Sequence, residues 1–106
     1  MRDRGPAERG ETVRETLRKA LREGSATARD LSAIAGIREK DVAEHLEHLA
    51  RSLPHGGERL VVEPARCLAC DYRFSDRGRL TRPGACPSCR STRIDPQLFR
   101  IEARAE

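Results

Sequence analysis

Aromatic residues are scarce in this 106-residue chain, which contains no tryptophan, one tyrosine and two phenylalanines. Apolar residues make up 37% of it, in runs far shorter than the roughly 20 residues that a transmembrane helix needs. The chain also lacks a nucleophile–base motif, a phosphate-binding glycine loop and an HExxH motif. We therefore expect a small protein that is neither an enzyme nor a membrane protein.

An apolar targeting segment is missing from the start of the chain as well. Residues 1–6 read MRDRGP and lack the hydrophobic region of a secretory signal, so we expect a cytoplasmic protein. Because that compartment is reducing, the four cysteines are expected to bind a metal rather than to form disulfides.

Lysine is nearly absent from an otherwise strongly charged sequence. Charged residues make up 36% of the chain, against roughly 25% in typical globular proteins, and only two of the 21 basic residues are lysines. Residues 1–56 hold 11 basic and 10 acidic side chains, whereas residues 64–93 hold seven arginines against two aspartates. The net charge of +4 therefore originates mainly in the second half of the chain.

The first half has the apolar spacing of helices. Residues 1–10 are charged and contain glycine and proline, which predicts a disordered lead. A helical repeat begins at Val13, where Thr12 and Glu15 have the spacing of a capping box. Gly24 is expected to end this first helix.

A second and a third helix are predicted to follow. Thr27 and Asp30 offer another capping box, and Gly36 breaks the second helix after about two turns. The third helix is expected over residues 38–52, with Ile37 filling the corner between the two. The expected inward residues are Leu31, Ile34 and Ala35, then Val42, Leu46, Leu49 and Leu53. Three short helices with this turn are typical of a helix-turn-helix unit.

Two β-strands flank the cysteine-containing segment. Residues 60–63 are rich in β-formers, and residues 98–102 alternate, with Phe99 and Ile101 on one face. Two strands after three helices can form the wing of a winged helix. The connection between them is over 30 residues long, far longer than the 2–5 residues of a usual hairpin loop, and it holds all four cysteines.

The cysteines have metal-ligand spacing. Cys67 and Cys70 form one C-x2-C turn, and Cys86 and Cys89 form a second one 15 residues later. Two such turns can place four thiolates in a tetrahedron around one ion, which leaves no open position for a reacting water. We expect structural zinc; disulfides, free thiols and an iron centre are the alternatives.

The cysteine segment has too few apolar residues to fold alone. Ordering about 30 residues costs about 1–2 kcal/mol each for the backbone, which a bound metal can offset. Asp71 and Arg90 stand where many such turns have glycine, and the arginine is expected to make the second turn less regular. The apolar residues of the segment are Leu68, Tyr72, Phe74, Leu80 and Ile94.

Several motifs together resemble a known family. These are the three-helix unit, the strand at 60–64, the PARC-x-x-C segment ending at Cys70, the RP-x-x-CP-x-C segment ending at Cys89, and the final strand. They resemble a small prokaryotic family of predicted transcriptional regulators that fuse a winged helix-turn-helix to a rubredoxin-like zinc ribbon. The resemblance covers roughly residues 11–103 and implies zinc at the four cysteines, a ribbon inserted at the wing, and DNA binding.

The expected fold class is α+β: a small winged helix-turn-helix, with three helices and a two-stranded wing, into which a zinc ribbon is inserted. A disordered lead is expected over 1–10. The winged helix would take residues 11–63 and 97–103, and the zinc ribbon residues 64–96.

The third helix is the expected DNA-recognition helix. Its outward face also carries Glu44 and Glu47, whose carboxylates would repel phosphates. Arg14, Arg18 and Arg22 on the first helix are expected to form local ion pairs rather than to contact DNA. The candidate DNA contacts are Arg38, Lys40 and Arg51 on the third helix and Arg77, Arg79 and Arg82 in the ribbon.

Three functions from different classes remain open. The first is a regulator that binds double-stranded DNA and contains structural zinc. The second is a protein-interaction module that docks on the transcription machinery through its acid-bearing helix. The third is an electron-transfer protein with iron at the four thiolates.

Overall fold

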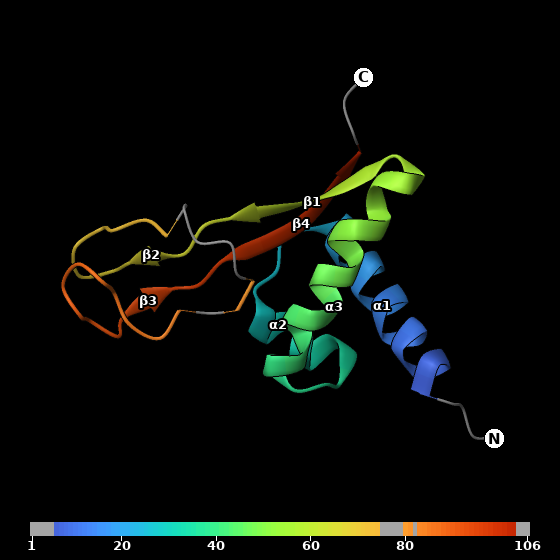
Figure 1. The fold of residues 1–106 in the computed structure, drawn as a ribbon, viewed down its shortest axis with the longest axis horizontal. Helices are drawn as coiled ribbons and strands as arrows, with labels where there is room; N and C mark the ends of the chain where they lie inside the picture. The colour runs from blue at the N-terminus through green and yellow to red at the C-terminus, as the bar shows by residue number, and fades with distance from the viewer. Residues whose placement is uncertain (1–5, 75–79, 82, 104–106) are drawn as a thin grey trace.

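The computed structural model describes residues 6–74, 80–81 and 83–103. Three helices and a two-stranded sheet pack together, and a slender extension projects from one end of that sheet (Figure 1). The elements are α1 (Pro6–Glu23), α2 (Ala28–Ala35), α3 (Glu39–Ser52), the 3-10 helix η1 (Leu53–Gly56), β1 (Glu58–Glu63), β2 (Arg66–Cys67), β3 (Ile94–Asp95) and β4 (Leu98–Ala103). The α+β winged-helix prediction is confirmed.

Helix α1 begins earlier than the sequence pattern predicted. It starts at Pro6, so residues 6–10 belong to the helix and not to a disordered lead. Proline suits the first turn because its fixed φ is helical and its missing N–H would have no partner there. Thr12 therefore lies inside the helix and does not cap it; its carbonyl accepts a hydrogen bond from the Thr16 hydroxyl at 3.1 Å. The end of α1 just before Gly24 is as predicted.

Helices α2 and α3 form the predicted helix-turn-helix. Thr27 accepts a hydrogen bond from the Asp30 N–H, and the Asp30 carboxylate accepts one from the Thr27 N–H, which completes the capping box. Gly36 ends α2 with φ of 69°, a left-handed conformation that glycine adopts without steric cost. Ile37 then packs against the core at the corner, and α3 begins after Arg38.

The main core lies between the three helices and strand β4. Its largest fully buried side chains are Leu17, Leu21, Leu31, Val42, Leu46, Leu49 and Phe99. Ile34 was expected in this core, but 52% of it is exposed. The buried stripe of α2 runs through Ala28, Leu31 and Ala35, at i, i+3 and i+7, and Ile34 lies off that stripe.

Strands β1 and β4 form the wing. They pair antiparallel, with Leu60 opposite Ile101 and Val62 opposite Phe99. The α1–α2 connection adds a single antiparallel bridge to this sheet. Ala26 exchanges two backbone hydrogen bonds with Phe99, of 3.0 and 2.9 Å. This long-range pairing ties the start of the helix-turn-helix to the sheet.

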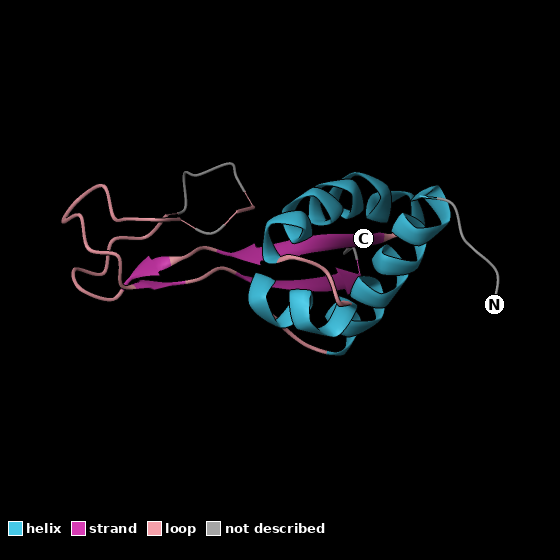
Figure 2. Ribbon diagram, turned by 90° about the horizontal axis from the view of Figure 1, so that it is seen from below, coloured by secondary structure: helices cyan, strands magenta, loops and turns pink. Residues whose placement is uncertain are grey.

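The extension beyond the wing contains the cysteine segment. β2 follows β1 and β3 precedes β4, and β2 and β3 pair antiparallel, so the chain leaves and re-enters the wing as two neighbouring strands. Figure 2 shows the helices gathered around the longer pair of strands, at a distance from the far end of the extension. Leu80 was counted with the cysteine segment, but its side chain packs against the main core. In the described residues, no helix is long and apolar enough to cross a membrane.

The contrast between Leu31 and Ile34 on α2 can be tested directly. Leu31→Ala should lower the free energy of unfolding by about 2–5 kcal/mol, because it removes a fully buried side chain from the core. Ile34→Ala should change it by about 0.5 kcal/mol or less, because much of this side chain is already in water. Urea unfolding followed by far-UV circular dichroism measures both. Equal losses for the two variants would contradict this packing of α2.

Candidate metal centre

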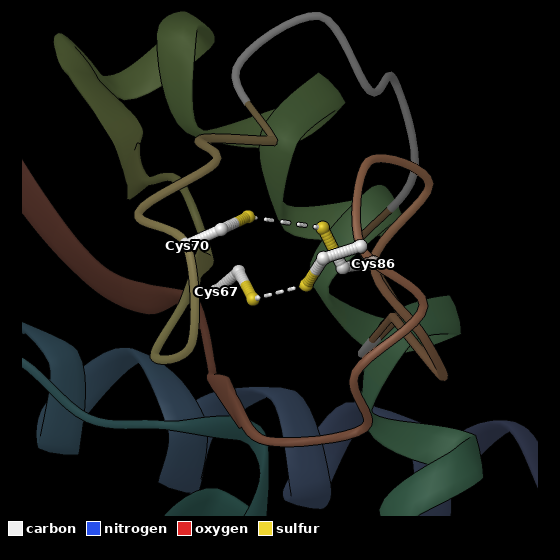
Figure 3. A group of neighbouring side chains, drawn as sticks. Cys67, Cys70 and Cys86 are labelled. Atoms are coloured by element: carbon white, nitrogen blue, oxygen red, sulfur yellow. Dashed lines mark hydrogen bonds between the residues drawn. The ribbon is translucent and has the colours of Figure 1, made fainter.

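Four cysteines from two separate turns meet at the far end of the extension. The Sγ atoms of Cys67 and Cys89 are 3.6 Å apart, and those of Cys70 and Cys86 are 3.7 Å apart. All four sulfurs lie within 4.8 Å of one another. A tetrahedral ion with Zn–S bonds of about 2.3 Å requires sulfurs about 3.8 Å apart. The cluster therefore fits a metal ion such as zinc, and Figure 3 shows Cys67, Cys70 and Cys86 pointing toward one another.

The first C-x2-C turn is held by its own backbone. The Cys67 N–H donates to the Tyr72 carbonyl at 2.8 Å, and the Asp71 N–H donates to the Cys67 carbonyl at 2.9 Å. The Ala69 N–H points at the Cys67 sulfur from 3.3 Å. To close the turn, Asp71 adopts φ of 68°. The backbone thus aims an amide dipole at a sulfur that must be a thiolate when it binds metal.

The second turn repeats the first one closely. The Cys86 N–H donates to the Ser91 carbonyl at 2.9 Å, the Arg90 N–H donates to the Cys86 carbonyl at 2.8 Å, and the Ser88 N–H lies 3.3 Å from the Cys86 sulfur. Arg90 adopts the same φ of 68° as its counterpart in the first turn. The expectation of a less regular second turn was wrong, because the hydrogen bonds of the turn hold Arg90 in this conformation.

The sulfurs influence one another's ionisation. Burial opposes the thiolate of Cys67, but backbone amides of Cys70 and Ala69 and the neighbouring thiols lower its pKa to about 7. Burial likewise opposes the thiolate of Cys86, whose pKa is lowered by two backbone amides of its own turn. The Ser91 amide favours the thiolate of Cys89, yet burial and the three other cysteines raise its pKa to about 12. Four thiolates this close repel one another, and a bound cation removes that cost.

A small second core supports the cysteines. It contains Ala65, Cys67, Phe74 and Cys86, with Ile94 packed against it. Leu68 and Tyr72, which are also among the apolar residues of the segment, are 49% and 39% exposed. The Tyr72 ring instead meets the Phe74 ring edge-on, with centroids 5.1 Å apart. Two cysteine side chains thus contribute to a core that otherwise has little apolar content.

The structure describes three of the six candidate DNA contacts. Arg38, Lys40 and Arg51 are exposed at α3, but the Arg38 Nε donates to the Asp41 carboxylate at 3.0 Å. The guanidinium of Arg38, which was expected to contact the DNA groove, is thus engaged in an ion pair with a residue three positions later. Arg77, Arg79 and Arg82 lie outside the described residues.

The arginines of α1 form ion pairs, as expected. Arg14 pairs with Glu11 at 3.3 Å, and Arg18 pairs with Glu15 at 2.8 Å. Arg22 binds Glu58 at the start of β1 through two hydrogen bonds of 2.9 and 2.8 Å, which lower the pKa of Glu58. The first two pairs lie within α1, and the third joins α1 to the wing. The helix therefore offers few uncompensated positive charges.

Removing the metal should uncouple the two cores. We expect Cys86→Ser or a chelator to unfold the cysteine segment while far-UV circular dichroism retains most of the helical signal, because the main core contains none of the ligands. Ser88→Ala is the matched control: its backbone N–H, which faces Cys86, is unchanged, and metal should still bind. Loss of the whole helical signal on metal removal would refute two separable cores.

The positive φ at position 90 allows a second test. Arg90→Gly should bind zinc within about 1 kcal/mol of the native chain, because glycine adopts this conformation without strain. Arg90→Val should weaken zinc binding by about 1–3 kcal/mol, because a β-branched side chain strains the left-handed region. Competition with a chromophoric chelator measures both. If valine bound zinc as tightly as glycine, the left-handed turn would not be required.

Comparisons with known proteins agree with this architecture. Residues 12–61 match the family described as PF0610-like, N-terminal. A search of curated proteins finds no match. The chain is similar to the solution NMR structure of protein PF0610 from Pyrococcus furiosus, with 26% sequence identity and a TM-score of 0.75. The similarity covers 98% of this chain and 97% of the archaeal one, so the helices, wing and cysteine segment are shared together.

Proposed function

We propose that this protein is a DNA-binding transcriptional regulator whose cysteine segment is held by structural zinc. The observation that carries the proposal is a winged helix with uncompensated arginines on its inserted segment. Arg73, Arg90 and Arg93 are exposed, and within the described residues none of them has a carboxylate partner. Unpaired arginines attract phosphates, whereas paired ones would first have to break an ion pair.

Zinc is the metal that fits this role best. Four thiolates close the coordination sphere, so the ion organises the chain and has no position for a substrate. Iron also accepts four thiolates, and iron would favour electron transfer instead. Metal analysis and the colour of the purified protein distinguish the two, because a zinc tetrathiolate is colourless. The regulator proposal requires zinc and a non-enzymatic role.

The helical half supports a second candidate function, docking on a protein. Glu44 and Glu47 are exposed on α3, and no ion pair engages them in the part of the chain that is described. Carboxylates on a recognition helix oppose phosphate contact and suit a basic partner surface. This alternative predicts that α3 is the interaction surface, whereas the arginines favour DNA at the cysteine segment.

DNA binding should depend steeply on salt. We expect zinc-loaded protein to bind mixed double-stranded DNA at low ionic strength and to lose affinity as salt rises, because bound phosphates release counterions. Fluorescence anisotropy at several salt concentrations measures this. Absence of binding even at low salt would eliminate the DNA proposal.

Charge reversal on α3 separates DNA binding from protein docking. Glu47→Lys should strengthen DNA binding if DNA approaches α3 and should abolish capture of a protein partner if α3 docks on protein. Glu23→Lys at the exposed end of α1 is the control, because it makes the same charge change away from α3. A Glu47→Lys chain that behaves like the Glu23→Lys chain in both assays would remove α3 from either interface.

A further inference from the structure

The strand register gathers arginines on one face of the cysteine segment. Arg66 on β2 lies opposite Asp95 on β3 and, on its other side, opposite Arg73. Residues opposite each other in antiparallel strands point to the same face. The Arg93 carbonyl accepts a hydrogen bond from the Leu68 N–H at 2.9 Å, so the pairing continues to Arg93. Because Arg93 precedes Asp95 by two residues, it shares that face as well.

Ion pairing leaves two of these arginines without a carboxylate. The Arg66 guanidinium is engaged twice, by Asp71 at 2.7 Å and by Asp95 at 3.9 Å. No other acidic residue of the described cysteine segment is available, since residues 64–74, 80–81 and 83–97 contain only these two. Among the described residues, Arg73 and Arg93 are therefore exposed and have no carboxylate partner, whereas Arg66 between them is ion-paired.

The spacing of this arginine pair suits a nucleic-acid groove. Arg73 pairs with Arg66 on one side of β2, and Arg93, just before β3, pairs on the other side, so the two residues lie two strand spacings and two residues apart. Strand spacings of about 4.8 Å and rises of about 3.4 Å per residue place their Cα atoms about 12 Å apart. The major groove of B-DNA is about 12 Å wide, so two arginines can reach phosphates on its opposite sides.

Helix α3 is less suited to the same task. Arg38, which precedes the helix, is bound to Asp41, and the exposed Lys40 is followed on α3 by the exposed Glu44 and Glu47. A groove of about 310 Å³ also runs beside its first turns, with Leu80 and Thr81 forming the opposite wall. The returning cysteine segment therefore flanks the end of α3 that would enter a major groove.

We infer that Arg73 and Arg93 form the DNA-contacting face, and that they bind the phosphate backbone of a duplex across its groove without reading the bases. This inference rests on the proposed DNA binding and names the surface that performs it. Arg66 lies between these two arginines and takes no part in this contact, because Asp71 and Asp95 engage its guanidinium. The guanidinium group suits this contact because its planar fork can bind phosphate through two hydrogen bonds.

The test compares two pairs of unpaired surface cations. The zinc-loaded Arg73→Ala/Arg93→Ala chain is titrated with two random-sequence duplexes at several salt concentrations. We expect affinity to fall by on the order of tenfold to a hundredfold, and the slope of log affinity against log salt to shrink by about two, since each lost phosphate contact removes about 0.9. The native chain should bind both duplexes equally well.

The Lys19→Ala/Arg29→Ala chain is the matched control, because both residues are exposed, lack an ion pair among the described residues, and lie on α1 and α2. This control also removes two positive charges, and its slope of log affinity against log salt should equal that of the native chain. Arg73→Lys/Arg93→Lys should also keep most of the slope, and zinc content with circular dichroism verifies that every variant is folded.

The outcomes distinguish failure of the proposed DNA binding from failure of the Arg73 and Arg93 face. If the native chain binds no duplex at low salt, the proposed function fails together with this inference. If the native chain binds, but the Arg73→Ala/Arg93→Ala chain matches it or weakens no more than the Lys19→Ala/Arg29→Ala control, only the assigned face is wrong. Strong preference of the native chain for one of the two duplexes would overturn backbone-only contact.

Discussion

Mutual repulsion between four sulfurs is the constraint on which the outer half of the molecule depends. The backbone brings them within 4.8 Å of one another and points amides at two of them, but it cannot compensate four thiolate charges. A cation at their centre can. Because Cys67 and Cys86 also belong to the small second core, an ion that neutralised the charge would also hold two side chains of that core in place. A single bound ion would therefore both compensate the thiolate charges and stabilise the buried part of this segment.

The two cores are joined by two kinds of link. Strands β1 and β4 continue into β2 and β3, which fixes the direction of the extension. Leu80 then returns from the cysteine segment to pack against the main core, beside the first turns of α3. The extension is thus anchored at its base and again along its length.

The sequence predicted those features that local chemistry determines. Thr27 with Asp30, Gly36, and the two C-x2-C turns each carry their signal within a few residues, and the structure has helix ends and a sulfur cluster where they indicated. Features set by distant parts of the chain carried no such signal. The pairing of Ala26 with Phe99, the packing of Leu80 on the main core and the exposure of Ile34 depend on which neighbours fold against them. Ion pairing also decided which arginines remain free, and composition alone could not show that.

The wing has a consequence for how the protein assembles. Glu63 and Leu98 are paired at its inner end, although 34 residues separate them in the chain. Bringing such distant segments together carries an entropic cost and slows folding, because a long loop must close before the contact forms. An ion bound by the two cysteine turns would close most of that loop, so that the two strands would meet as near neighbours. A metal ion held by the four cysteines would therefore speed formation of the wing and also stabilise the segment that binds it.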